Sequence, residues 1–209
     1  MSSPPVPAPA DADVLIVGAG PAGLALACAL GVAGLRIRLI EQQTLDALEA
    51  PADDGREIAL THRARRIMTE LGMWARLPVE SISPLRQARV LDGDSPTGLC
   101  LEASPAAGEQ ALGWLVPNHR IRRAAYEAAM ACPGVQLEAG ARVVSLSRGA
   151  PLATVGLEDG RAWRAPLVVA ADSRFSQTRR LAGIGASMRD FGRTVIVGPL
   201  AHALPDRKS

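Results

Sequence analysis

The sequence predicts an α/β fold in which a parallel β-sheet with helices is combined with an antiparallel β-meander. Three observations lead to this prediction. An apolar strand runs through a glycine-rich turn into a helix, a second apolar strand ends in a carboxylate, and three short β-like segments precede a further apolar strand. Strands that alternate with helices are typical of parallel sheets, and short strands separated by turn residues are typical of meanders.

The first element is a strand, a turn and a helix near the N-terminus. Val14 to Val17 is an uninterrupted apolar run, and the glycines that follow have the spacing G-x-G-x-x-G. Gly18 allows a tight turn, Gly20 lets the backbone approach a pyrophosphate, and Gly23 lets the helix pack closely on the strand. The helix is expected to begin near Pro21, with its N-terminal N–H groups facing phosphates.

The second strand, Ile37 to Glu41, completes this unit. Glu41 follows Gly23 by 18 residues, where a carboxylate can accept hydrogen bonds from the ribose of an adenosine. The alternative is a membrane span, because no charge occurs between Val14 and Leu35. Five glycines and a proline in that stretch, with aspartates before it, favour a strand, turn and helix instead.

Composition excludes several other classes of protein. The chain of 209 residues is 48% hydrophobic and 21% charged with a net charge of +2, which is ordinary for a globular protein. It has no dense basic run with aromatic residues, so nucleic-acid binding has no support. The three cysteines are widely separated in sequence and lack a C-x-x-C pair, which suits a reducing compartment and excludes a cysteine-rich metal site. Cys28, in the first helix, is expected to fill the core.

The remaining elements can be placed in order. An Ala/Asp/Gly-rich loop, 44–55, leads to a helix over 61–71 that ends at Gly72. We expect this helix to bury Ala64, Ile67, Met68 and Leu71 and to expose Arg63, Arg65 and Arg66. Further predictions are a hairpin over 86–102 that turns at 92–96, a helix over 118–131, a parallel strand at 135–138, a meander at 141–148, 152–158 and 161–165, and a buried strand at 167–170.

These segments resemble the single-component FAD monooxygenases that hydroxylate aromatic rings, and most closely the branch that acts on ubiquinone precursors. The likeness rests on GAGPAG, Glu41, the run Asp54-Gly-Arg-Glu-Ile-Ala-Leu60 and the segment AADSRFSQTRR at 170–180. It extends from about residue 11 to 205. It implies an FAD-binding Rossmann-like sheet with a meander, together with part of a mixed β-sheet of a substrate domain.

The resemblance implies roles for individual residues. The FAD pyrophosphate would lie at Gly18, Gly20, Pro21, Ala22 and Gly23, and the adenosine ribose at Glu41 and Gln42. Arg56 would reach the flavin side of the site, although a loop arginine paired with Asp53, Asp54 or Glu57 is the alternative. Asn118 matches a polar residue near the ribityl chain, with a helix N-cap as the equally weighted alternative.

Asp172 matches an aspartate that touches FAD and takes part in the use of NAD(P)H. A cap of the turn after the strand is its alternative role. The family has glycine at the next position, where this chain has Ser173, and a Cβ there is unfavourable if the backbone needs a positive φ. Handling of the reductant is therefore where the chain departs from the family pattern.

The chemistry implied is that of the cofactor. NAD(P)H would reduce FAD, O₂ would give a flavin C4a-hydroperoxide, and an aromatic substrate would take the distal oxygen. The three histidines lack metal-ligand spacing, so no metal site is predicted, and no side chain is assigned a catalytic role. NADH and NADPH fit equally, and the sequence indicates no oligomeric state.

Family members are nearly twice as long and carry a Gly-Asp motif in their second half. The expected units here are a disordered tail (1–10), an FAD-binding unit (11–80), partial substrate-domain strands (81–117), the rest of the FAD-binding domain (118–183) and the start of a truncated substrate domain (184–209) that includes a strand-like run at 194–197. A missing strand of the central sheet would leave an exposed edge. A non-catalytic FAD-binding remnant is the alternative to an enzyme.

The expected location is the cytoplasm. Enzymes of quinone pathways can need a membrane surface, so peripheral membrane contact stays open, but no amphipathic basic helix supports it.

Overall fold

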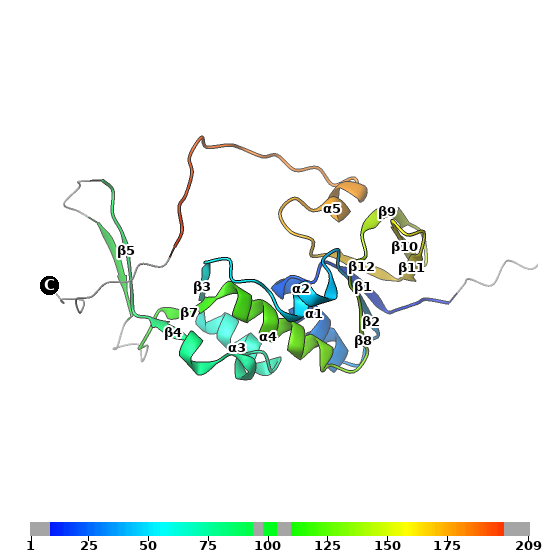
Figure 1. Cartoon of the computed structure of the whole chain (residues 1–209). Coiled ribbons are helices and arrows are strands. Elements are labelled where there is room, and N and C mark those ends of the chain that lie inside the picture. The colour runs from blue at the N-terminus through cyan, green and yellow to red at the C-terminus, as the bar shows by residue number, and fades with distance from the viewer. Residues whose placement is uncertain (1–8, 94–97, 104–109, 199–209) are drawn as a thin grey trace, which may run out of the picture.

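The computed structural model describes residues 9–93, 98–103 and 110–198. A four-stranded parallel sheet in the order β12-β1-β2-β8 lies between two helices on one face and a three-stranded meander on the other (Figure 1). The strands of this sheet are β1 (Val14–Val17), β2 (Ile37–Ile40), β8 (Val135–Glu138) and β12 (Leu167–Ala170). The helices are α1 (Pro21–Val32) and α4 (Asn118–Met130), and the meander is β9 (Val143–Arg148), β10 (Ala153–Leu157) and β11 (Ala162–Ala165).

Alternation along β1 explains why both faces of the sheet are covered. Val14 and Ile16 pack with α1 and α4, whereas Leu15 and Val17 pack with the meander. Successive side chains of a strand point to opposite faces, so a strand with four buried apolar residues needs an apolar layer on each side. The helical layer is thin because α4 presents small side chains to the core, namely Ala124, Ala125, Ala128 and Ala129.

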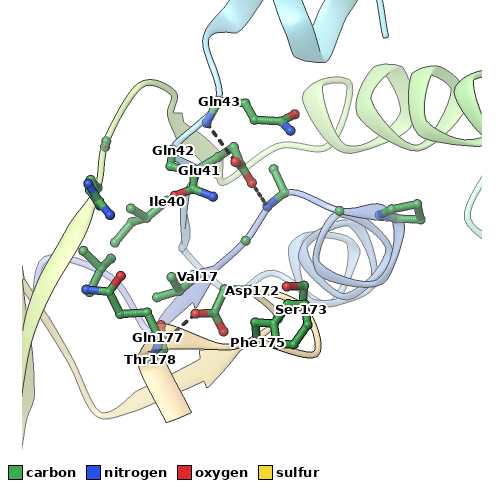
Figure 2. A pocket seen from close by; sticks show the side chains of 18 of the residues that line it. Val17, Ile40, Glu41, Gln42, Gln43, Asp172, Ser173, Phe175, Gln177 and Thr178 are labelled. Carbon is green, nitrogen blue, oxygen red and sulfur yellow. Dashed lines mark hydrogen bonds between the residues drawn. The ribbon is translucent and has the colours of Figure 1, made fainter. Parts of the chain in front are cut away.

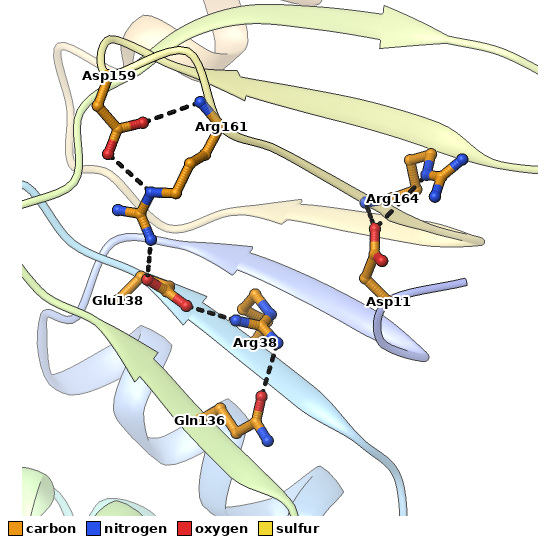
Figure 3. A network of polar contacts seen from close by, with 7 residues as sticks. All are labelled: Asp11, Arg38, Gln136, Glu138, Asp159, Arg161 and Arg164. Atoms are coloured by element: carbon orange, nitrogen blue, oxygen red, sulfur yellow. Dashed lines mark hydrogen bonds and ion pairs between the residues drawn. The ribbon is translucent and has the colours of Figure 1, made fainter. Parts of the chain in front are cut away.

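A polar network fastens the meander to the sheet (Figure 3). Arg38 of β2 forms an ion pair with Glu138 of β8, and its guanidinium carbon lies 3.6 Å from the centre of the Trp163 ring on β11. The other carboxylate oxygen of Glu138 accepts a hydrogen bond from Arg161 Nη1 at 2.7 Å. Glu138 therefore links a strand of the sheet to the turn between β10 and β11.

A second region is formed by α3 and the strands β3 to β7, whereas α2 packs on α4 and α5 packs on β9 of the meander. An antiparallel sheet in the order β3-β7-β4 packs beside α3, and the two-stranded hairpin β5-β6 projects from it (Figure 1). The bounds of all the remaining elements are α2 (Leu45–Glu49), β3 (Glu57–Leu60), α3 (His62–Glu70), η1 (Trp74–Arg76), η2 (Val79–Ser81), β4 (Ser83–Leu85), β5 (Gln87–Val90), β6 (Leu99–Glu102), β7 (Gly113–Pro117) and α5 (Gln177–Leu181).

Most elements predicted from the sequence are confirmed. The β1-α1-β2 unit, the parallel pairing of β8 with β2, the meander, the hairpin and the helices α3 and α4 are all present. Parts of two predictions, the tail over 1–10 and the turn over 92–96, lie outside the described residues. No helix within the described ranges is long and apolar enough to cross a bilayer.

Three predictions about strands and loops are wrong. The stretch 167–170 is a strand but is not buried: Leu167 is 52% exposed, because β12 lies at an edge of the sheet. The run 194–197 is not a strand, and Ile196 is 95% exposed, because no described segment pairs with it. The loop 44–55 contains the short helix α2.

The prediction for α3 is partly wrong. Met68 is buried as expected, but Ile67 is 41% exposed. Arg65 is not simply solvated, because its guanidinium carbon lies 4.3 Å from the centre of the Trp114 ring and 5.1 Å from that of Trp74. A guanidinium over an aromatic face is a cation–π contact, which periodicity alone does not reveal.

Candidate cofactor-binding site

A cavity of about 660 Å³ opens where β1, β2 and β12 end (Figure 2). The carboxyl ends of parallel strands meet at one edge of a sheet, which is where open α/β sheets bind ligands. Eight of the residues singled out in the sequence line it: Gly18, Gly20, Pro21, Glu41, Gln42, Arg56, Asn118 and Asp172. Ala22 and Gly23 do not line it, because they belong to the first turn of α1 behind the glycine loop.

The three glycines of the motif differ in how much space a Cβ would have. Gly18 has a φ of +108°, and a Cβ there would lie 2.5 Å from the carbonyl oxygen of Ala171. A Cβ on Gly23 would lie 2.0 Å from the carbonyl oxygen of Gly18. By contrast, no atom lies within 4 Å of a Cβ built on Gly20, which lines the cavity. The backbone of Gly20 is thus open to a ligand, as the motif predicts.

The Glu41 carboxylate is nearly buried and holds the glycine turn against β2. It is 9% exposed; Oε2 accepts a hydrogen bond from the Ala19 N–H at 2.6 Å and Oε1 accepts one from the Gln43 N–H at 2.8 Å (Figure 2). A carboxylate has about four acceptor positions, so acceptor capacity is left for hydroxyl groups of a ligand. Glu41 therefore shapes the turn and also presents a carboxylate to the cavity.

Arg56, Asp54 and Asn118 form one cluster on the wall of the cavity. Asp54 Oδ2 accepts hydrogen bonds from Arg56 Nε at 2.9 Å and from Asn118 Nδ2 at 2.8 Å. The hydrogen bond from Arg56, and to a smaller extent that from Asn118, holds the pKa of Asp54 far below its usual value. Arg56 therefore does pair with a neighbouring carboxylate, as the alternative interpretation of the sequence expects. It also lines the cavity, so the pairing does not remove it from the candidate site.

Asn118 is not a helix N-cap. Pro117 occupies the cap position, and Asn118 is the first residue of α4. Its backbone N–H donates to the Arg56 carbonyl oxygen at 2.8 Å, and its side chain reaches Asp54. The cap interpretation is wrong because β7 runs directly into the helix and leaves Asn118 inside the first turn.

Asp172 caps the turn that follows β12. Its carboxylate accepts a hydrogen bond from Ser176 Oγ and another, at 2.9 Å, from the Thr178 N–H; Figure 2 shows the second of these bonds. Burial raises the pKa of Asp172, but these two hydrogen bonds outweigh it and hold the pKa below its usual value. The predicted capping role is present, and the residue also lines the cavity.

Ser173 has the strained backbone that its replacement of a glycine suggests. Its φ is +82°, and it alone among the described non-glycine residues has a positive φ. A side chain in this region costs of order 1–3 kcal/mol. The chain therefore carries local strain at the residue next to Asp172.

Ser173→Gly is expected to raise the free energy of unfolding by about 1 kcal/mol, because relief of strain exceeds the added entropy of the unfolded chain. Urea denaturation measures it. Ser147→Gly, on the exposed face of β9, is the matched control and should lower stability, since glycine weakens a strand. A Ser173→Gly protein no more stable than the original would contradict the strain argument.

Sequence reasoning missed three arginines of the cavity. Arg122, Arg142 and Arg180 line it together with Arg56. Arg122 could have been found, because it lies one helical turn after Asn118 and so on the same face of α4. It donates to Gln43 Oε1 at 2.7 Å, beside Glu41. Arg142 and Arg180 reach the cavity through the packing of the meander and α5, which no local pattern indicates.

The family model described as FAD binding domain matches residues 11–203. The ubiquinone hydroxylase UbiM of Neisseria meningitidis is 46% identical over 90% of the chain, and the ubiquinone hydroxylase UbiL of Rhodospirillum rubrum is 39% identical over 86%. The chain spans 41% of the length of each of these relatives.

Solved structures share the fold. PqsL of Pseudomonas aeruginosa matches with a TM-score of 0.71 and 25% identity, over 86% of this chain and 48% of that one. The anhydrotetracycline hydroxylase OxyS of Streptomyces rimosus matches with a TM-score of 0.70 and 26% identity, over 86% of this chain and 35% of that one. This chain therefore belongs to the FAD-binding monooxygenase family and corresponds to the N-terminal part of its members.

Proposed function

We propose that this chain is the cofactor-binding part of an NAD(P)H- and O₂-dependent monooxygenase that hydroxylates an aromatic ring of the ubiquinone-precursor type. The observation that carries the proposal is the cavity at the strand ends, where an open glycine turn faces Glu41 and four arginines. The likeness to two ubiquinone hydroxylases supports the substrate class.

The residues that line the cavity fit the adenosine and pyrophosphate of FAD. The open space at Gly20 admits a phosphate to the N-terminus of α1, whose N–H groups favour anions. The unused acceptor positions of Glu41 suit ribose hydroxyls, with Gln42 beside them. Two negative charges on the pyrophosphate would be balanced by arginines of the cavity, to which Arg122 and Arg142 contribute.

The flavin side of the cofactor would lie toward Arg56 and Asn118. The two side chains share Asp54, so the cluster is held in place before a ligand arrives. Preorganised donors need little reorganisation when the ligand binds. Asp172 and Ser173 also line the cavity, and the bonds from Ser176 and Thr178 fix the carboxylate of Asp172.

When bound, FAD supplies the hydride acceptance and oxygen chemistry of the reaction. The chain itself would bind and orient the cofactor through the glycine turn, Glu41 and the arginines. In the relevant pH range Asp172 stays ionised, because its hydrogen bonds lower its pKa. Asp172 would therefore act as a fixed negative charge and hydrogen-bond acceptor rather than as a proton donor.

Glu41→Gln is expected to lower the free energy of unfolding by about 1–3 kcal/mol even without FAD, because the amide turns an N–H donor toward the N–H of Ala19 or Gln43. Thermal or urea unfolding measures it. Glu80→Gln is the matched control, since Glu80 is exposed in η2 and its substitution should change nothing. Equal stability of the two variants would show that Glu41 does not hold the turn.

Complementation tests the proposed activity. The whole gene that carries this coding sequence is supplied to a bacterial strain deleted for its own ubiquinone hydroxylases, and quinone intermediates are measured by mass spectrometry. A newly hydroxylated ring, absent with the Gly20→Ala gene, supports the proposal. No hydroxylated product, from a chain that binds FAD when purified, favours the alternative of an FAD-binding protein without catalysis.

A further inference from the structure

Two cysteines that are far apart in sequence meet in the structure. Cys28 lies in α1 and Cys132 lies just after the end of α4, 104 residues later, and their Sγ atoms are 2.8 Å apart. The third cysteine, Cys100, is exposed on β6 of the projecting hairpin. Neither Cys28 nor Cys132 lines the cavity described above.

Close packing of the two helices brings these thiols together. Where α1 approaches the end of α4, a Cβ built on Gly31 would lie 3.4 Å from the Cβ of Cys132. The Sγ of Cys132 donates to the Ala128 carbonyl oxygen at 3.3 Å, and the Sγ of Cys28 lies 3.9 Å from the same oxygen. Both side chains therefore point to one small volume between the helices.

The two sulfurs are already close to bonding distance. A disulfide has an S–S length of about 2.05 Å, so each sulfur needs to move by only about 0.4 Å. Cys28 is 1% exposed, whereas Cys132 is half-buried, so an oxidant reaches Cys132 first. Burial, and then the contact with Cys132, raise the pKa of Cys28 to about 12, which keeps Cys28 a thiol until its partner reacts.

We propose that Cys28 and Cys132 are a redox pair that forms a reversible disulfide when the protein meets a hydroperoxide. Hydrogen peroxide oxidises the Cys132 thiol to a sulfenic acid and is itself reduced to water. The Cys28 sulfur then attacks the Cys132 sulfur, an S–S bond forms, and the hydroxyl leaves with the Cys28 proton as a second water. Two thiols and one peroxide thus give one disulfide and two waters, and a dithiol reductant reverses the change.

The disulfide would join the two helices that begin at the cavity. α1 starts beside the glycine turn, and α4 starts at Asn118. Both cysteines lie toward the other ends of these helices, so the bond would fix the helix pair without entering the cavity. Closing a long loop stabilises a folded protein mainly by restricting the unfolded chain. The oxidised protein is therefore expected to melt several degrees above the reduced protein and to keep the same cavity.

Peptide mapping tests the proposal, because trypsin places the three cysteines in separate peptides: 1–36 with Cys28, 90–120 with Cys100 and 124–142 with Cys132. The full chain is treated with a small excess of hydrogen peroxide, free thiols are blocked with a maleimide, and the non-reduced digest is analysed by mass spectrometry. The expected product is peptide 1–36 joined to peptide 124–142, and it should disappear after treatment with dithiothreitol.

Cysteine variants distinguish the disulfide between Cys28 and Cys132 from unspecific oxidation of the cysteines. Cys132→Ser should remove the joined peptide and the rise in melting temperature, while Cys100→Ser should keep both. Cys28→Ser is a second probe, since Cys132 would then stop at the sulfenic acid or beyond. Disulfides that contain Cys100, or Cys132 oxidised to sulfinic acid in the original chain with no joined peptide, would overturn the proposal.

Discussion

Gly23→Ala is expected to destabilise the protein by about 3 kcal/mol or more, at the upper end for an overpacked site. The added Cβ would lie 2.0 Å from the carbonyl oxygen of Gly18, and that atom belongs to the backbone of the tight turn. A backbone atom cannot rotate away as a side chain can, so β1 and α1 would have to separate. Urea denaturation, or the yield of folded protein, measures the effect.

Gly31→Ala is the matched control in the same helix. Its Cβ would meet the side chain of Val135 at 2.9 Å, which can shift, and the carbonyl oxygen of Pro133 at 3.2 Å, which needs to give by only a few tenths of an ångström. The gain in helix propensity on replacing glycine with alanine, about 1 kcal/mol, offsets part of the crowding. Its change in stability should therefore stay within about 1 kcal/mol. If Gly23→Ala were as mild as Gly31→Ala, the close contact of α1 with the turn would not hold.

Gly20→Ala is expected to weaken FAD binding at least about 10-fold while leaving the fold intact, since a loss of about 1.4 kcal/mol in binding corresponds to that factor. In the protein alone the new Cβ meets no atom within 4 Å, so there is nothing for it to displace. With FAD bound, the Cβ would occupy the space through which the pyrophosphate approaches the backbone. Alanine is also a poorer N-cap than glycine, which lowers the stability of the variant without unfolding it.

FAD titration and thermal melting, made on the same samples, separate these two effects. Gly185→Ala is the matched control, because Gly185 also has open space around a built Cβ but lies outside the cavity. It should change neither FAD affinity nor melting temperature. An unchanged FAD affinity in Gly20→Ala would mean that the pyrophosphate does not bind at this turn.

The central sheet could be predicted because its signals are local. Val14 to Val17 is apolar throughout, the glycine spacing follows at once, and Asp159-Gly160 marks a turn of the meander. Such signals depend on strand period and turn chemistry, which tertiary packing seldom overrides.

The errors arise where a neighbour in space decides the outcome. The exposure of Leu167 depends on its strand being at an edge of the sheet, and the exposure of residues 194–197 depends on the lack of a described pairing strand. The period of α3 does not show that Arg65 covers Trp114. Edge position and stacking are properties of the assembled fold, so a single sequence does not specify them.

In the candidate site too, the contacts set by local motifs could be predicted, and the contacts between distant segments could not. The motif residues lie together because one strand, turn and helix place them, and Glu41 lies opposite because β2 pairs with β1. The approach of Asn118 to Asp54 and of Cys28 to Cys132 joins segments 64 and 104 residues apart, and neither pair has a spacing signal. Contacts of this range follow from how α4 packs and are visible only in three dimensions.

The measurement that tests the central claim most directly is FAD binding by the purified chain. FAD is removed, then titrated back while the visible absorbance and the quenching of flavin fluorescence are recorded, in parallel with the Gly20→Ala protein. We predict one FAD per chain with a perturbed flavin spectrum, and weaker binding by the variant. A folded chain that stays colourless and leaves added FAD unchanged would contradict the assignment of this cavity to FAD.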